Sequence, residues 1–336
     1  MNLRKIAGII AGLCVAIIVV APIPASAKGP KSTGTIYVAN YWEFTGVSSV
    51  TAYPLGSHGN VTPSAEIIGR NTGLIAPSSV AVDSSGYIYV TNEITDGTVT
   101  VYPPRSAGNA PPSATLKVGV YPNGVEVDSN GYVYVILGGF GWIYVYAPGS
   151  NGYDMPIATI FGDNTGLDAP VDIALDSSGN IYVLNVSEKE GGFDSVLVFA
   201  PGSNGNVAPI AEISGSKTGL DGPQFIAVDS NGYIYVTNLY AYSVTIFSPG
   251  SNGNVAPHAT IKGPRTELNE PTGIAVDSAG KIYVANLATP RGPHSMPSIT
   301  VYAPKSHGNV KPIAKITGNR TGLIGPYGIT IGSAGP

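Results

Sequence analysis

The stretch "VDSNGYIYVTN" runs from Val228 to Asn238, and close copies run from Val82 to Asn92 and from Val276 to Asn286. In each copy an Asp-Ser-x-Gly sequence separates an apolar run from an alternating run rich in aromatic and β-branched residues. Asp accepts hydrogen bonds from backbone N–H groups just downstream, and Gly takes the left-handed position of a tight turn. Because such alternation is typical of strands, each copy predicts two antiparallel strands joined by a tight turn.

The copies belong to a repeat that organises most of the chain. The Tyr of the "IYV"-type triplet recurs at intervals of 52, 45, 48, 53 and 48 residues. These residues are Tyr37, Tyr89, Tyr134, Tyr182, Tyr235 and Tyr283. Each unit holds four short apolar runs split by turn residues, which in the fifth unit are residues 225–229, 233–238, 243–247 and 258–262. Four antiparallel strands in a repeat of roughly 50 residues predict an all-β fold, the β-propeller.

The two ends of the chain each carry part of a unit. The first unit opens near Thr35 with its second run, whereas "PYGITIG" at Pro326–Gly332 matches the opening run "PTGIAVD" at Pro271–Asp277. We expect the C-terminal strand to pair with the N-terminal blade. This closes a six-bladed propeller of four-stranded antiparallel blades and removes sheet edges that invite aggregation.

The opening run of each unit is expected to be the innermost strand. In "GIAV", Gly273 and Ala275 lie on one face, and Ile274 and Val276 lie on the other, because side chains alternate along a strand. Neighbouring sheets crowd together near the axis of a propeller. The small face of one inner strand is therefore expected to receive the large face of its neighbour.

The N-terminal residues predict an export signal. Arg4 and Lys5 precede an apolar run from Ile6 to Ile23, and residues 25–27 form the small-x-small pattern of a cleavage site. An uncleaved membrane anchor is the alternative, because the run approaches the length that spans a bilayer. The expected organisation is a signal peptide at 1–27, a short linker at 28–34 and the propeller at 35–336.

Composition narrows the compartment and the partners. Only 11% of the 336 residues are charged, the net charge is −4, and no Lys/Arg run follows the extreme N-terminus. This argues against nucleic acid as a partner, and against a membrane beyond the signal segment. The single cysteine, Cys14, lies inside the apolar run, so the mature chain would form no disulfide. We expect an exported protein, located in the cell envelope, the periplasm or the medium.

The segment "PTGIAVDSAGKIYVAN" at Pro271–Asn286 strongly resembles the NHL repeat, a family of propeller repeats. The resemblance covers nearly all of the mature chain in six imperfect copies. It differs from the family pattern where the second strand ends in Asn instead of Asp. The resemblance implies a six-bladed propeller of an exported bacterial NHL-repeat protein. Such propellers serve as protein-binding, RNA-binding and enzymatic scaffolds, so the fold does not select the activity.

The Asn residues that end the second strands are expected on the face where propellers gather ligands. These residues are Asn40, Asn92, Asn185, Asn238 and Asn286. We expect them to bond loop backbone at the strand ends, as Asn does in turns. A ring of ligand-binding amides is the alternative, although Leu137 interrupts it in the third unit.

Four inner-strand positions break the small-residue pattern. They are Glu126, Asp172, Phe225 and Thr330. A carboxylate near a narrow axis must be hydrated, paired or metal-bound, because burying it bare costs several kcal/mol. We expect a water-filled channel without a cofactor. The alternative is a divalent cation such as Ca²⁺, because Glu126, Asp172 and Asn185 loosely resemble the Glu, Asn and Asp set of lactonase-type six-bladed propellers.

Aromatic residues cluster in the loops between second and third strands. Together with Phe225 near the axis, the candidate ligand-binding residues are Tyr41, Trp42, Phe44, Phe140, Trp142, Tyr240 and Tyr242. Exposed aromatic clusters suit a glycan or a protein partner. The alternative interpretation is that long loops pack against one another.

Catalytic motifs are scarce, and we assign no catalytic residue. Of the four histidines only His294 is expected on the ligand face, whereas streptogramin lyases of related propeller form depend on axial histidines. We therefore predict a binding or interaction module that takes a protein or glycan on its axial loop face. The alternative is a metal-dependent hydrolase or lyase of the lactonase or streptogramin-lyase type.

Overall fold

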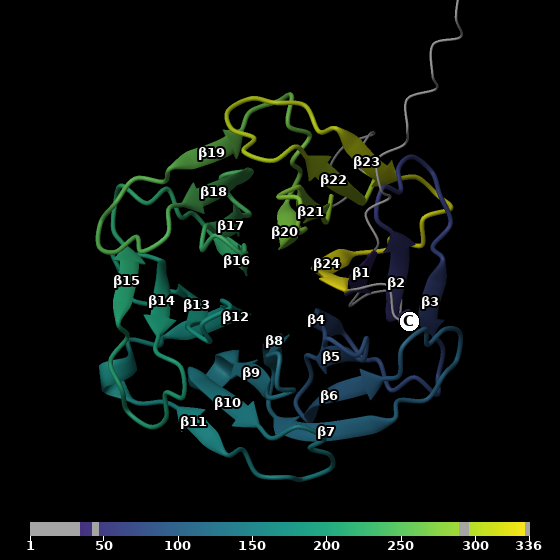
Figure 1. The fold of residues 1–336 in the computed structure, drawn as a ribbon, viewed down its shortest axis with the longest axis horizontal. Helices are drawn as coiled ribbons and strands as arrows, with labels where there is room; N and C mark the ends of the chain where they lie inside the picture. The colour runs from purple at the N-terminus through teal and green to yellow at the C-terminus, as the bar shows by residue number, and fades with distance from the viewer. Residues whose placement is uncertain (1–33, 42–46, 289–295, 333–336) are drawn as a thin grey trace, which may run out of the picture. The chain divides into compact units, whose positions relative to one another are not determined.

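The computed structural model describes residues 34–41, 47–288 and 296–332. Within them, six four-stranded antiparallel sheets stand as blades around a common axis (Figure 1). The predicted six-bladed β-propeller is therefore confirmed. Helical structure in these ranges is confined to two 3-10 turns, η1 (Gly138–Phe140) and η2 (Asp163–Thr165). None of the helices described is long and apolar enough to cross a membrane.

Each blade runs from an inner strand at the axis to an outer strand at the rim. Blade 1 contains β24 (Pro326–Gly332), β1 (Thr35–Asn40), β2 (Ser49–Pro54) and β3 (Ala65–Ile68). Blade 2 contains β4 (Pro77–Val82), β5 (Ile88–Asn92), β6 (Gly97–Tyr102) and β7 (Ala114–Gly119). Blade 3 contains β8 (Pro122–Val127), β9 (Val133–Leu137), β10 (Trp142–Tyr146) and β11 (Ala158–Ile160).

The other three blades follow the same order. Blade 4 contains β12 (Ala169–Leu175), β13 (Ile181–Val186), β14 (Ser195–Phe199) and β15 (Ala211–Ser214). Blade 5 contains β16 (Pro223–Val228), β17 (Ile234–Asn238), β18 (Ser243–Phe247) and β19 (Ala259–Lys262). Blade 6 contains β20 (Pro271–Val276), β21 (Ile282–Asn286), β22 (Ser298–Tyr302) and β23 (Ala314–Thr317).

The ring closes as the orphan segment predicted. β24 pairs antiparallel with β1, so that Tyr37 lies opposite Thr330 and Thr35 lies opposite Gly332. The C-terminal strand thus becomes the inner strand of the blade that the N-terminal residues begin. In Figure 1 the yellow β24 lies beside the purple β1.

The turn that joins the first two strands has the chemistry that its sequence implies. In blade 5, Asp229 Oδ1 accepts the N–H groups of Asn231 and Tyr233, each at 2.9 Å. Its other oxygen accepts the hydroxyl of Tyr235 at 3.1 Å, and Gly232 has a φ of 80°. One carboxylate therefore fixes both the turn and the tyrosine of the repeated triplet.

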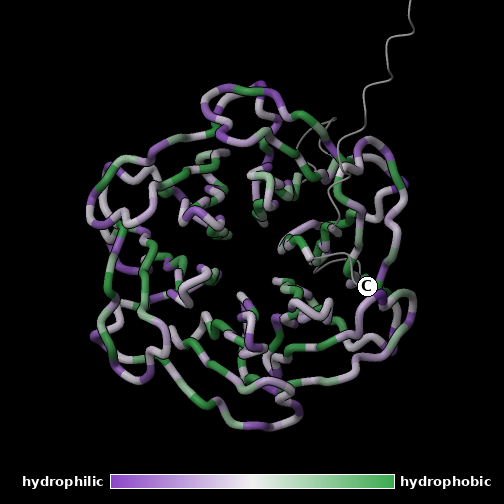
Figure 2. Tube along the Cα trace, in the orientation of Figure 1, coloured by the Kyte–Doolittle hydropathy of each residue, from purple (hydrophilic) through white to green (hydrophobic). Residues whose placement is uncertain are grey.

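Apolar side chains fill the spaces between neighbouring blades. Figure 2 shows the strands mainly in green and white, with most of the purple in the loops around the rim. Close packing at the axis depends on small residues. A Cβ added at Gly273 would lie 2.3 Å from the carbonyl oxygen of Tyr327 and 2.8 Å from a methyl of Ile329, both on the next inner strand. The small faces of inner strands therefore receive their neighbours, as the sequence predicted.

At the rim, an asparagine side chain accepts a hydrogen bond from the loop that leads into its own blade. Asn254 Oδ1, for example, accepts the N–H of Lys217 at 2.8 Å, and the side chain covers Gly215. We call this contact the inter-blade latch. In the described residues the same latch is made by Asn60, Asn109, Asn206, Asn254 and Asn309.

Candidate functional site

The six inner strands enclose a channel along the axis. Its cavity volume is about 210 Å³, and every inner strand contributes to its wall. The lining residues are Ser79 and Val80 of β4, Val125 and Glu126 of β8, and residues 172–175, 225–228, 274–276 and 329–331 of the others. Two carboxyl groups, those of Glu126 and Asp172, thus lie in a wall that is otherwise mainly aliphatic.

Asp172 connects blade 4 to blade 5. Its side chain is buried, and Oδ2 accepts the backbone N–H of Ile226 at 2.9 Å. Burial raises the pKa of Asp172 well above its ordinary value, the N–H groups of Ile226 and Ile173 lower it, and the nearby Glu126 raises it further. Burial dominates, so the carboxyl stays neutral to higher pH than an ordinary Asp and keeps an O–H donor.

Glu126 lies on the inner strand of the adjacent blade. Burial raises the pKa of Glu126 to about 7, and a hydrogen bond from the N–H of Val127 to Oε1 at 3.1 Å opposes that rise. Glu126 therefore changes its charge near neutral pH. Because a charged Glu126 raises the pKa of Asp172, protonation of the two groups is linked.

Aromatic side chains meet at the end of the channel where the inner strands begin. The ring of Tyr327 lies 5.3 Å from that of Tyr41 and 5.2 Å, edge to face, from that of Phe225. Its hydroxyl donates to Oε1 of Gln224 at 3.2 Å. Burial, together with the nearby Glu93, raises the pKa of Tyr327, so the phenol remains protonated. The sequence analysis selected Tyr41 and Phe225 but missed Tyr327 and Gln224.

Asn123 takes the same position on β8 as Gln224 on β16 and Tyr327 on β24. Its Oδ1 is the single buried side-chain polar atom without a hydrogen-bond partner in the described ranges. An unpaired buried acceptor costs about 1–3 kcal/mol, and the Asn123 side chain lies against Gly138 in the turn after β9. We call Tyr41, Asn123, Gln224, Phe225 and Tyr327 the axial mouth.

Four other predicted aromatic residues, Phe140, Trp142, Tyr240 and Tyr242, do not join the axial mouth. Tyr240 is 71% exposed, and its ring lies against Gly222, where an added Cβ would be 2.4 Å away. Tyr242 is exposed in a left-handed conformation, with a φ of 49°. Phe140 and Trp142 stack at 5.2 Å and lie at the boundary of blades 2 and 3, where Trp142 lines a separate groove. Trp42 and Phe44 lie outside the described residues.

The asparagines at the strand ends bond loop backbone, as expected. Asn185 is buried; its Oδ1 accepts the N–H of Asp168 at 2.8 Å, and its Nδ2 lies 3.4 Å from Ser195 Oγ. The Oδ1 atoms of Asn40, Asn92, Asn238 and Asn286 accept equivalent N–H groups. These amides hold the loops that enter blades 1, 2, 4, 5 and 6.

The residues do not fit the lactonase-type metal set. Glu126 and Asp172 line the channel, but Asn185 does not, and its amide oxygen is already bonded. Within the described part of the chain no group of three His, Cys, Asp or Glu residues is placed to hold a metal ion. His294 lies outside the described residues, so the expectation about it stays a prediction.

Comparisons with known proteins support the architecture. No family model matches the chain, and no curated protein matches it. Among solved structures, a protein of unknown function from Bacteroides caccae has 12% identity and a TM-score of 0.61, covering 89% of this chain and 99% of that one. The periplasmic gluconolactonase of Pseudomonas aeruginosa has 13% identity and a TM-score of 0.56, covering 90% and 100%. A Lactobacillus plantarum protein has 14% identity and a TM-score of 0.55, covering 84% and 82%. At such identity these likenesses show the fold alone.

Proposed function

We propose that this protein is a non-enzymatic binding module whose axial mouth takes an uncharged polar ligand, either a glycan end or a loop of another protein. The observation that carries the proposal is the convergence of three aromatic rings, those of Tyr41, Phe225 and Tyr327, beside amide groups at one end of the channel. Binding sites commonly combine aromatic surface with a few fixed polar groups.

The polar groups at this end select a neutral ligand. The unpaired Oδ1 of Asn123 suits a donor, such as a hydroxyl or an amide N–H. Burial keeps Asp172 protonated beyond the pH range of an ordinary Asp, so it brings no full charge at mildly acidic pH. A ligand with hydroxyl groups and an apolar face matches this combination of rings and neutral polar groups.

A glycan array and a pull-down from envelope extracts test the proposal. Gln224→Ala and Tyr41→Ala should each weaken the binding of the ligand that is found, whereas Tyr87→Ser, in an exposed turn on blade 2, should leave it unchanged. Saturable binding that neither mouth variant alters would remove the mouth as the site.

A second candidate is a hydrolase or lyase that uses Glu126 and Asp172. The observation that favours it is that both carboxyl groups have raised pKa values and line one channel. Such carboxyl groups serve as general acids and bases. Assays of the purified protein on lactone and ester substrates separate the candidates: turnover that is lost in both Glu126→Gln and Asp172→Asn would favour the enzyme, and no turnover in the parent would remove it.

The proposed compartment is outside the cytoplasm. It rests on the charged start, apolar run and small-x-small site within residues 1–27, which lie outside the described residues. N-terminal sequencing of the protein from cell fractions tests it. A mature chain that begins after Ala27 in the periplasm or the medium is the expected result, and an intact N-terminus in the cytosol would contradict it.

A further inference from the structure

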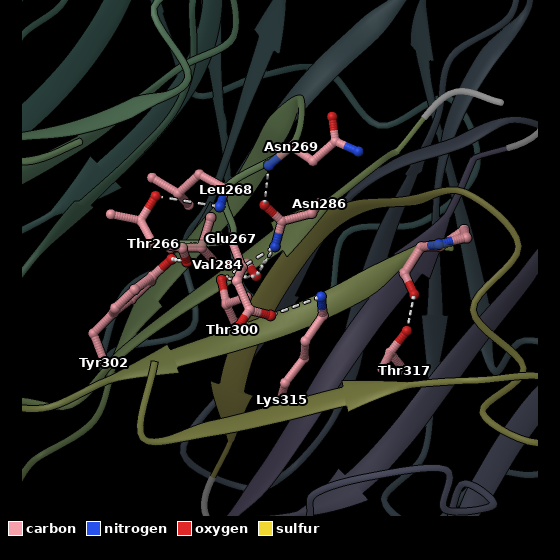
Figure 3. A network of polar contacts seen from close by, with 11 residues as sticks. Thr266, Glu267, Leu268, Asn269, Val284, Asn286, Thr300, Tyr302, Lys315 and Thr317 are labelled. Carbon is pink, nitrogen blue, oxygen red and sulfur yellow. Dashed lines mark hydrogen bonds and ion pairs between the residues drawn. The ribbon is translucent and has the colours of Figure 1, made fainter. Parts of the chain in front are cut away.

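At most blade boundaries, the loop that runs from the outer strand of one blade to the inner strand of the next is hydrogen-bonded to the second blade. Figure 3 shows the boundary of blades 5 and 6, where Tyr302 donates its hydroxyl to the carbonyl of Thr266 at 2.6 Å. Asn286 accepts the N–H of Asn269 at 3.0 Å and donates to Thr300 Oγ1 at 3.1 Å. The loop is therefore tied to the blade that follows by two side chains of that blade, Tyr302 and Asn286.

The same arrangement recurs at other boundaries. Tyr102 donates to the carbonyl of Thr72 at 2.6 Å, and Tyr53 donates to that of Thr321. The loop length is constant, because the inner-strand Pro follows the last buried Ile of the preceding outer strand by ten residues. These pairs are Ile67 and Pro77, Ile160 and Pro170, Ile213 and Pro223, Ile261 and Pro271, and Ile316 and Pro326.

The boundary between blades 2 and 3 lacks this loop. Pro122 follows Leu116 by only six residues, so four residues are missing. Leu137 replaces the strand-end asparagine that would bond the loop, and Tyr153 replaces the latch asparagine. All three changes affect the boundary of blades 2 and 3. The deletion removes most of the loop, Leu137 removes the asparagine that would bond it, and Tyr153 removes the latch asparagine.

Aromatic residues replace the small ones that face the loop elsewhere. Trp142 and Tyr144 take the β10 positions that correspond to Thr98 and Thr100 on β6. With Tyr146 they form a row of rings along the strand, with centroids 6.1 Å and then 6.0 Å apart. Phe140 at 5.2 Å and Phe161 at 5.7 Å from Trp142 complete it.

The row does not fill the space that the loop leaves. A groove of about 700 Å³ remains between the two blades. We call it the inter-blade groove; its walls include Asp96 and Lys117 from blade 2, and Trp142, Tyr144, Tyr146, Tyr153, Asp154, Met155 and Phe161 from blade 3. Tyr153 is 85% exposed, and Met155 is 80% exposed. Clustered exposed apolar side chains mark a binding surface more often than a packing accident.

One wall residue shows where a ligand would bond. Tyr146 is 1% exposed and corresponds to Tyr53, Tyr102 and Tyr302, each of which donates its hydroxyl to a loop carbonyl. Within the described residues the hydroxyl of Tyr146 makes no hydrogen bond to another protein group; it is not a fully buried unpaired atom, because Tyr146 borders the groove. A phenol in this position normally finds an acceptor.

We propose that the inter-blade groove binds an extended, uncharged oligosaccharide. Sugar rings carry an apolar C–H face that packs on aromatic rings, and the row along β10 offers three such rings in succession, with centroids 6.1 and 6.0 Å apart and neighbouring planes tilted by 43° and 83°. Sugar hydroxyls both donate and accept, which matches the hydroxyl of Tyr146 and the charged groups of Asp96, Asp154 and Lys117.

Two alternatives fit the groove less well. A polyanion is disfavoured, because its walls carry two carboxylates, Asp96 and Asp154, and one ammonium group, Lys117. A peptide that copied the missing loop would meet Tyr144 where other boundaries have a small or aliphatic side chain; the loop glycine Gly73, for instance, packs on Thr100. The groove is separate from the axial mouth, so this proposal stands or falls independently of the proposed function.

The test uses the mature chain and three neutral probes, the β-1,4-linked hexasaccharides of glucose, N-acetylglucosamine and xylose. We expect at least one to bind saturably in calorimetry. Tyr146→Phe, which removes only the hydroxyl, should weaken binding about 2- to 10-fold, in line with one hydrogen bond. Tyr153→Ser, at an exposed position that tolerates change, should weaken it by a similar or larger factor.

Controls separate binding from folding. Tyr102→Phe removes the equivalent hydroxyl at a closed boundary, so it should lower stability but leave the affinity for the probe unchanged. The proposal is overturned if no probe binds up to millimolar concentrations, or if Tyr146→Phe and Tyr153→Ser bind as well as the parent. A third result would also overturn the proposal. If no sugar binds, and a proline-rich peptide binds the parent but neither groove variant, the groove belongs to a protein partner.

Discussion

Replacement of Glu126 by Gln should make the protein more stable at alkaline pH and leave it unchanged at acidic pH. Burial raises the pKa of Glu126 from 4.5 to about 7 in the folded protein. The folded state therefore keeps a proton that the unfolded state releases between these values. Stability from this group is fully present below about pH 4.5 and is lost as the pH rises through 7.

The size of the effect follows from the two pKa values. Each unit of pKa corresponds to about 1.4 kcal/mol, so a pKa of about 7 in place of 4.5 costs the folded protein about 3 kcal/mol once Glu126 is ionised. Gln removes the charge, and its amide oxygen can still accept the N–H of Val127. At about pH 8, Glu126→Gln should therefore unfold with a free energy up to about 3 kcal/mol higher than the parent.

Urea unfolding at a series of pH values, followed by tryptophan fluorescence, measures this difference. The difference in the free energy of unfolding between variant and parent should rise from near zero at about pH 4 to its full value above about pH 7. Glu212→Gln, at an exposed position on β15, is the matched control, and its unfolding free energy should differ from that of the parent by the same small amount at every pH. If the parent and Glu126→Gln curves stay parallel across the range, the carboxyl is hydrated like a free glutamate, and the electrostatic account of the channel is wrong.

Three further outcomes follow from the described contacts. Asp172→Ala should lower the free energy of unfolding by about 1–3 kcal/mol, because it leaves the N–H of Ile226 unpaired, whereas Asp172→Asn should lose less than about 1 kcal/mol; urea unfolding near pH 6 compares them. Asn206→Ala should cost about 1 kcal/mol by removing an inter-blade latch, whereas Tyr153→Ala, at the joint without a latch, should leave thermal stability within about 0.5 kcal/mol of the parent. Deletion of residues 324–336 removes β24 and exposes an edge of β1, so size-exclusion chromatography should show aggregation in place of a monomer or defined oligomer, and an unchanged profile would contradict the role of closure.

The fold was predictable because each part of it depends on a short-range pattern. The turn at Asp229 needs only four neighbouring residues, and the alternation in the following strand needs only six. The repeat then multiplies this signal, and the match between Pro326–Gly332 and Pro271–Asp277 shows how the ring must close. Errors of one or two residues at strand ends do not change such an inference.

The candidate site was only partly predictable. Glu126 and Asp172 stand out because the repeat expects small residues there, and both line the channel. Tyr327 was missed because it does not occupy one of the small-residue positions of its strand, of which Thr330 is one. Trp142 was expected on the ligand face because its loop joins a second to a third strand, but it lines a groove between blades, because the position of a side chain depends on packing between blades, which no local pattern reports.

The sequence contains evidence for the inter-blade groove, which becomes visible when the loop lengths of the six units are aligned. One interval is four residues short, and Leu137, Trp142 and Tyr153 all depart from the repeat on either side of it. Each departure alone resembles ordinary drift between repeats. Only the structure shows that Trp142 and Tyr153 line one groove, at the boundary where Leu137 replaces the loop-binding asparagine.

The unequal joints also bear on how the ring can deform. Every boundary has a parallel backbone bridge at the rim, and the one between blades 2 and 3 joins Leu116 to Gly152. That joint lacks the loop tie and the asparagine latch found at the others, and it is held near the axis by Ser78 and Thr91, whose hydroxyls donate to the backbone carbonyls of Pro122 and Asn123. Separation at this boundary would break one of the six rim bridges and leave all six blades joined in an open arc through the other five, each of which keeps its full-length loop.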